Sequence, residues 1–287
     1  MLSHFFFCTA TMCGRGDTSY CAPFSGGLKM SWEWLNGLDI RALFPITVVL
    51  IETMAEIGNR IGLRFHMAKA ENADVGTLAA ASLGLLALLV AFSISMAESR
   101  YDSRRNIVLE EANAIGSTAN FALMLPQWAQ QPILSLLRDY AAVRITLGVP
   151  DDPAKLQKDI ARSLDIQTRL WQQAVAVTAA NPQSLPAYRF VASLNEVNNI
   201  HEKRITALRN HVPLAVSFML VGTAMVAMGF TGFNAGAFGA RRRPITLIMS
   251  LMIAMLIMLV VDLDSPSRGL IHVSVQPLVD VVNGIPR

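Results

Sequence analysis

One stretch of the chain restricts its fold more than any other. Thr77 to Ala97 contains 21 residues without a charge, and a helix needs about 20 such residues to cross the hydrocarbon core of a bilayer. The residues that follow, Glu98 to Glu111, are densely charged, and no proline interrupts the transition. The pattern predicts a membrane helix that leaves the bilayer and continues unbroken outside it.

Three further segments are candidates for membrane helices. Val212 to Phe233 and Pro244 to Val261 carry no charge, and a short segment with Arg241, Arg242 and Arg243 joins them, which predicts a tight helical hairpin. Ile40 to Gly58 is long enough but contains a proline and two acids. Hydrophobic residues make up 53% of the chain and charged residues 16%, against about 25% charged in soluble domains. We therefore expect an all-α polytopic membrane protein with four transmembrane helices.

Between the second and third membrane helices, residues 98–211 are expected to form a helical bundle outside the membrane. The turn "GVPDDP" predicts a helix that begins at Pro153, with Asp152 as its N-cap. Apolar residues recur at helical spacing in three segments of this insert. The predicted stripes are Ile133, Leu136, Leu137, Tyr140, Val143 and Leu147; Leu156, Ile160, Leu164, Trp171 and Val175; and Phe190, Leu194, Val197, Ile205 and Leu208.

The remaining boundaries follow from these segments. Residues 30–97 hold the first two membrane helices, residues 212–261 the last two, and residues 262–287 a C-terminal segment. Residues 1–29 fit no targeting pattern, because they lack positive charge ahead of a sufficiently long apolar core. We interpret them as a mis-assigned start or a disordered extension.

Several functions are disfavoured by the sequence. A net charge of +3 gives no concentrated basic face for nucleic acid. All three cysteines precede Met30 without the Cys-x-x-Cys spacing of a redox or zinc motif, and we expect neither a metal site nor a cofactor. Phosphate-loop, zinc-protease and serine-hydrolase motifs are missing from the sequence, so we do not expect an enzyme.

Charged residues gather where the second and fourth helices leave the apolar segments. Interfacial arginines commonly anchor helices at headgroups. The acids Asp262 and Asp264 can either chelate Mg²⁺ or Ca²⁺ or pair with arginines at the same depth. We favour pairing, because the local sequence offers few further ligands. This charged collar and packing motif consists of Arg100, Arg104, Arg105, Glu111, Asn113, Asp262, Asp264 and Arg268.

Glu52 and Glu56 lie one helical turn apart on the first apolar helix. An acid inside a membrane span is costly unless it faces protein or water, so it is a candidate for an ion pathway. Ser93 on the second helix adds a hydroxyl to this set of pathway candidates. The alternative is a shorter first helix with Glu52 at the interface and Glu56 in a structural role.

Four segments together resemble a bacterial bestrophin-like membrane protein family of unknown function. They are "FSISMAESRYDSRRNIVLEEANAIGSTANFALMLP", "EIGNRIG", "NNIHEKRITALRNHVP" and "VVDLDSPSRGLIHVSVQPL", which occur in the family's order between residues 40 and 286. Bestrophins are oligomeric ion channels with four membrane helices in each subunit. The resemblance therefore implies a multi-pass protein of the cell membrane that forms a homo-oligomeric, passive ion channel.

A second class of function remains open. The chain could be a non-catalytic scaffold or sensor whose helical insert binds a soluble partner that the sequence does not identify. Positive residues near the spans are almost balanced between the two sides. Arg41 and Arg268 tip the positive-inside rule slightly toward a cytoplasmic insert and cytoplasmic termini.

Overall fold

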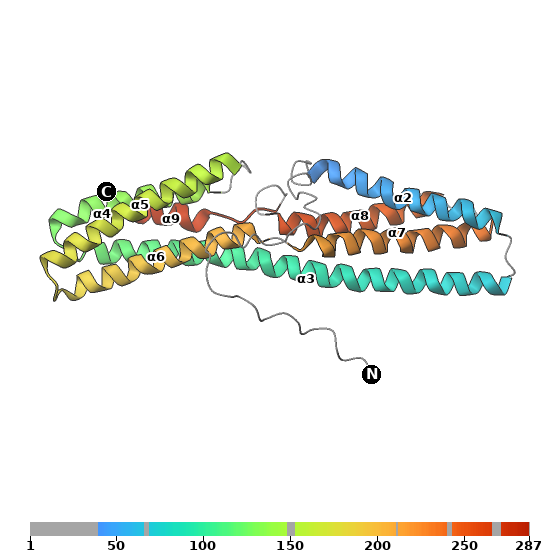
Figure 1. Ribbon diagram of the computed structural model, residues 1–287, viewed down its shortest axis with the longest axis horizontal. Helices are drawn as coiled ribbons and strands as arrows, with labels where there is room; N and C mark the ends of the chain where they lie inside the picture. The colour runs from blue at the N-terminus through green and yellow to red at the C-terminus, as the bar shows by residue number, and fades with distance from the viewer. Residues whose placement is uncertain are drawn as a thin grey trace, which may run out of the picture. The chain divides into compact units, whose positions relative to one another are not determined.

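The computed structural model describes residues 40–65, 69–147, 153–210, 212–239, 243–265 and 271–286. Within these ranges the regular backbone is helical, in eight helices labelled α2 to α9 (Figure 1). Their bounds are α2 Ile40–Arg64, α3 Lys69–Ala122, α4 Gln127–Thr146, α5 Pro153–Ala180, α6 Leu185–Arg209, α7 Leu214–Ala237, α8 Arg243–Asp264 and α9 Gln276–Gly284. Our interpretations of residues 1–29, Asp152 and Arg268 fall outside the described residues.

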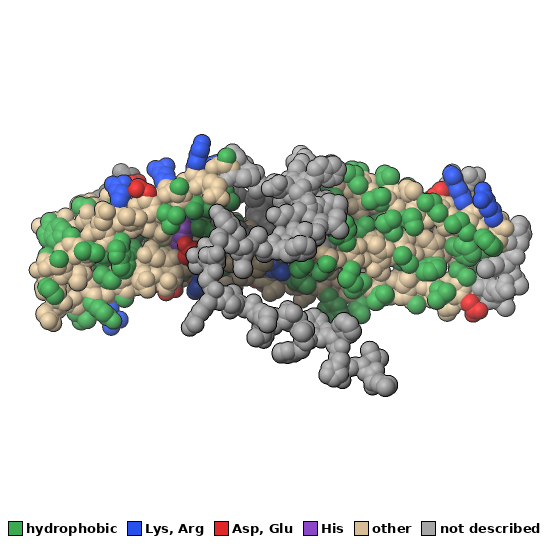
Figure 2. Space-filling model, in the orientation of Figure 1, with side chains coloured by type: hydrophobic (Ala, Val, Ile, Leu, Met, Phe, Trp, Pro, Cys, Tyr) green, Lys and Arg blue, Asp and Glu red, His purple; other side chains and the backbone are tan. Residues whose placement is uncertain are grey.

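Four of these helices are long and apolar enough to cross a membrane, as the sequence predicts. The candidate spans lie within α2, α3, α7 and α8. Side chains of all four meet in one apolar core that includes Ile51, Leu86, Met228 and Ile257. Figure 2 shows many hydrophobic side chains on the outer surface of these helices as well, which is the arrangement that lipid favours.

Helices α2 and α7 approach each other more closely than side chains would allow. A Cβ atom added at Gly58 would lie 2.1 Å from the Gly229 carbonyl oxygen, and one added at Gly232 would lie 2.0 Å from the Ala55 carbonyl oxygen. Small residues four apart permit such backbone contact between membrane helices. Helix α7 therefore packs mainly along α2 and much less along α8, which corrects the expected tight α7–α8 hairpin.

Helix α3 runs without a break from the membrane part, which consists of α2, α7, α8 and the N-terminal half of α3, into the bundle, which consists of α4, α5, α6, α9 and the C-terminal half of α3. Its 54 residues contain no proline, so the backbone hydrogen bonds continue past the predicted boundary at Ala97. The N-terminal half of α3 contributes Leu86 and Val90 to the membrane core, and the C-terminal half contributes Ile115 and Ala119 to a second core. The expectation that the helix continues unbroken past its apolar segment is confirmed.

The second core lies among α3, α4, α5, α6 and α9. All six residues of the stripe predicted for α4 are buried, and α5 begins at Pro153 as expected. The stripe predicted for α5 is wrong at three positions, because Leu164, Trp171 and Val175 are 42–57% exposed. The buried face of α5 instead consists of Ser163, Ile166, Gln167, Leu170, Ala174 and Val177. Small and polar side chains thus share the buried face with Ile166, Leu170 and Val177, while Leu164, Trp171 and Val175 remain outside.

The C-terminal segment returns from α8 to this bundle. Helix α9 packs against α3 and α4, with Leu278 and Ile285 buried in the second core. Arg138 on α4 donates a hydrogen bond to the carbonyl oxygen of Pro286. The end of the chain is therefore an integral part of the bundle.

Candidate functional site

A polar face runs along α3 where the helix leaves its apolar segment. A shallow depression of about 600 Å³ is lined by Ser95, Glu98, Ser99, Asp102, Ser103, Asn106, Ile107 and Glu110. We call these residues the α3 polar face. They include three carboxylates and no basic residue. Glu110 lies 3.9 Å from Lys203 of α6, so Glu98 and Asp102 supply most of the negative charge that favours cations on this surface.

The charged collar is brought together by backbone contacts. The guanidinium of Arg104 donates to the carbonyl oxygen of Leu263 at 2.5 Å, and the charge of Asp264 acts on the same guanidinium. Both carboxylate oxygens of Asp264 accept from the Val212 amide at 2.9 and 3.0 Å. Asp262 accepts from the amide of Ile271 at 3.1 Å. The two acids thus hold the segment that precedes α7 and the segment that follows α8.

Of the other described collar residues, three lie at the surface of α3 and one is buried. Arg100 donates to the side-chain oxygen of Asn210 at 2.9 Å and so ties α3 to the end of α6. Arg105 and Asn113 are exposed on α3. Glu111, by contrast, is fully buried and belongs to a separate network inside the bundle.

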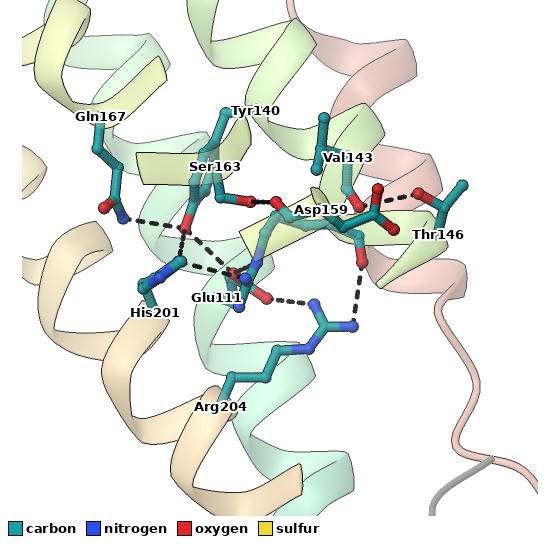
Figure 3. A network of polar contacts seen from close by, with 10 residues as sticks. Glu111, Tyr140, Val143, Thr146, Asp159, Ser163, Gln167, His201 and Arg204 are labelled. Carbon is teal, nitrogen blue, oxygen red and sulfur yellow. Dashed lines mark hydrogen bonds and ion pairs between the residues drawn. The ribbon is translucent and has the colours of Figure 1, made fainter. Parts of the chain in front are cut away.

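That network connects all four long bundle helices (Figure 3). Glu111 on α3 accepts from Arg144 Nε on α4 at 2.5 Å and from Arg204 Nη1 on α6. Arg144 Nη1 lies 3.2 Å from Nδ1 of His201, and Arg204 Nη2 donates to the Arg144 carbonyl oxygen at 3.0 Å. Tyr140 lies at hydrogen-bonding distance from both Glu111 and His201 and accepts from Gln167 on α5.

Burial and neighbouring charges alter the protonation of this network. Burial lowers the pKa of His201 to about 4, and the adjacent Arg144 adds to the effect. Because arginine has only donors, His201 Nδ1 acts as the acceptor of its Arg144 contact and the proton is on Nε2. Burial also raises the pKa of Tyr140 and lowers that of Arg204, although Glu111 opposes the shift of Arg204.

The ion-pathway candidates lie on two helices whose described residues do not pack against each other: Glu52 and Glu56 one turn apart on α2, and Ser93 on α3. Glu52 contacts α8, where it accepts from Thr246 Oγ1 at 3.0 Å and from Ser250 Oγ at 2.7 Å. Glu56 forms an ion pair with Arg60 at 3.1 Å. Ser93 is buried and donates to the Leu89 carbonyl oxygen at 2.7 Å. The structure therefore does not bring Ser93 to the two acids.

Sequence reasoning missed several residues of these sites. Arg144 lies in "AAVRITLG" between Val143, which is buried, and Ile145, which is partly buried. A charge inside such an apolar stripe could have indicated a buried partner. Thr246 and Ser250 are hydroxyl residues four apart near the start of an otherwise apolar helix. Among the described residues, no group of three or more His, Cys, Asp or Glu side chains could hold a metal ion.

Sequence comparison identifies the family. A bestrophin-like domain matches residues 60–278, which is more than half of the chain. The chain belongs to the bestrophin-like family. The four segments quoted above therefore placed this bestrophin-like protein in the correct family. No curated protein matches its sequence.

Solved structures share the fold of this bestrophin-like protein. A crystal structure described as a membrane protein aligns with a TM-score of 0.61 and 17% identity, over 84% of this chain and 95% of its own. Two structures of a bacterial bestrophin homolog from Klebsiella pneumoniae align over 86% of this chain and over 95% and 96% of their own. Their TM-scores are 0.59 and 0.58, at 17% and 18% identity. At these identities the likeness establishes the fold alone.

Proposed function

We propose that this bestrophin-like protein is a homo-oligomeric, passive ion channel of the cell membrane and not an enzyme. The observation that carries the proposal is the α3 polar face, which continues the apolar span of α3 as a surface with three acids. One subunit presents this face on one side of a single helix. A closed pathway requires several copies arranged around an axis, with α3 of each subunit facing the centre.

The charge of the α3 polar face predicts the selectivity. A ring of carboxylates raises the local concentration of cations and disfavours anions. The pathway outside the apolar segment is therefore expected to favour cations. Within the apolar segments, Glu52, Glu56 and Ser93 remain the candidates for the ion pathway. The collar residues Arg100, Arg104, Asp262 and Asp264 are proposed to hold the membrane helices to the bundle.

The test is passive ion flux across liposomes that contain the purified protein. We expect flux from wild-type protein, and a lower cation-to-anion permeability ratio in the double variant Glu98→Gln, Asp102→Asn. A matched control is Asp165→Asn, Glu196→Gln, which removes two exposed acids from α5 and α6 outside the α3 polar face. Its ratio should equal that of wild type.

Two results would contradict the channel. One is the absence of flux for several ions, in both orientations, from folded protein. The other is a detergent-corrected mass equal to one subunit, because a single copy cannot enclose a pathway. Either result would favour the alternative function, a membrane scaffold or sensor with a helical binding domain.

A further inference from the structure

Glu52 is an acid inside the membrane part whose charge is not matched by a neighbour. It lies near the middle of the candidate span Ala42–Arg64. Its hydrogen-bond partners are two neutral hydroxyls on α8, and none of the ion pairs among the described residues involves it. An ionised carboxylate at such a depth costs several kcal/mol without a partner.

Glu56, one helical turn further along α2, differs from Glu52 because it has a cationic partner. Its carboxylate lies 3.1 Å from the guanidinium of Arg60. The same helix thus supplies a cation for the acid near its end and none for the acid near its middle. A charge-balancing ion is therefore needed at Glu52 and not at Glu56.

The atoms around Glu52 suit a cation with oxygen ligands. The two carboxylate oxygens lie 3.0 Å from Thr246 Oγ1 and 2.7 Å from Ser250 Oγ, so four oxygens from α2 and α8 are close to one another. Each hydroxyl oxygen keeps lone pairs that can face a cation after its hydrogen rotates away. Protein oxygens can replace the hydration shell of an ion in this manner.

Charge and burial restrict the class of ion. Ser250 is fully buried and Thr246 is 9% exposed, and the neighbouring Ile51 and Ala55 on α2 are buried as well. One carboxylate balances one positive charge, so a divalent ion would leave an uncompensated charge in an apolar environment. We propose that Glu52, Thr246 and Ser250 bind one alkali-metal cation between α2 and α8.

The test measures binding to the full-length protein in detergent, not flux. We expect saturable binding of ²²Na⁺ with one ion per subunit, and a melting temperature that rises when NaCl or KCl replaces choline chloride at constant ionic strength. Glu52→Gln should abolish both effects. Ser250→Ala keeps the carboxylate and removes one ligand, so it should weaken binding about tenfold, which corresponds to about 1.4 kcal/mol.

Thr53→Ala is the matched control for Ser250→Ala, because it removes a hydroxyl next to Glu52 that donates to the Val49 carbonyl oxygen and not to the carboxylate. Its ²²Na⁺ binding should equal that of wild type. Two binding results would overturn the proposal: folded wild-type protein without saturable binding, or Glu52→Gln that binds ²²Na⁺ as wild type does. An infrared band of a protonated carboxyl that disappears in Glu52→Gln would also overturn it, because a neutral Glu52 needs no cation. The binding test and the flux test are independent. Absence of cation binding would not contradict the proposed channel, and absence of flux would not contradict this cation site.

Discussion

Glu111 is the residue on which the polar contacts of the bundle converge. Replacing it with Gln keeps the shape but leaves Arg144 and Arg204 without a counter-charge in a buried site. Loss of one partner of a buried ion pair typically costs about 3–5 kcal/mol. We expect Glu111→Gln to lower the free energy of unfolding by an amount of this order, measured by chemical unfolding in detergent.

The adjacent residue provides the control. Glu110 lies 3.9 Å from Lys203, and both side chains are more than half exposed. Surface pairs contribute about 1 kcal/mol or less, so Glu110→Gln should unfold almost as wild type does. Equal stabilities of the two variants would show that the buried network does not hold the bundle together.

His201 makes the bundle sensitive to acid. Its pKa of about 4 in the folded protein lies below the ordinary value of 6.5, so the unfolded state binds the proton first as the pH falls. The stabilisation is fully present above pH 6.5 and is lost progressively toward pH 4, by up to about 3 kcal/mol in total. Thermal unfolding measured across this pH range should show the loss.

A neutral replacement should remove this component. His201→Gln cannot take up a proton, so its melting temperature should fall less between pH 6.5 and pH 4 than that of wild type. His272→Gln changes an exposed histidine of the C-terminal segment and should keep the wild-type slope. A wild-type slope in His201→Gln would refute the assignment to His201.

At the scale of elements, the contact between α2 and α7 depends on glycine. A methyl group at Gly232 would lie 2.0 Å from the Ala55 carbonyl oxygen, so Gly232→Ala must push the helices apart. Overpacking of this kind typically costs about 1–3 kcal/mol. We expect Gly232→Ala to melt at a lower temperature in detergent.

Gly222 on the same helix is the matched control. No atom lies within 4 Å of a Cβ added there, and alanine favours a helix over glycine by up to about 1 kcal/mol. Gly222→Ala should therefore be as stable as wild type or slightly more stable. The same melting temperature for both variants would argue against close packing of α2 on α7.

Apolar spacing predicted the helices better than it predicted their neighbours. The membrane helices, the unbroken α3 and the buried faces of α4 and α6 follow from runs and periods that a single helix displays. The inward face of α5 could not be predicted in this way, because Ser163 and Gln167 are buried by contact with other helices while Trp171 is not. The partners of Glu111 and Glu52 likewise lie on helices distant in sequence, and spacing within one helix carries no information about them.

At the scale of the whole molecule, the sidedness of the bundle remains a prediction. Gln183 is exposed in the turn between α5 and α6, so a cysteine at this position should be accessible. If the bundle is cytoplasmic, an impermeant maleimide should label Gln183→Cys only after the cells are opened. The unsubstituted protein, with Cys8, Cys13 and Cys21, gives the background, and labelling above it in intact cells would reverse the assignment.

The unbroken course of α3 has a mechanical consequence. At a rise of 1.5 Å per residue, its 54 residues extend about 80 Å without a proline. A tilt of about 5° at one end would displace the other end by roughly 7 Å over that length. If α3 moves as one body, a small change of its angle in the bundle would shift the apolar end of the helix by this distance.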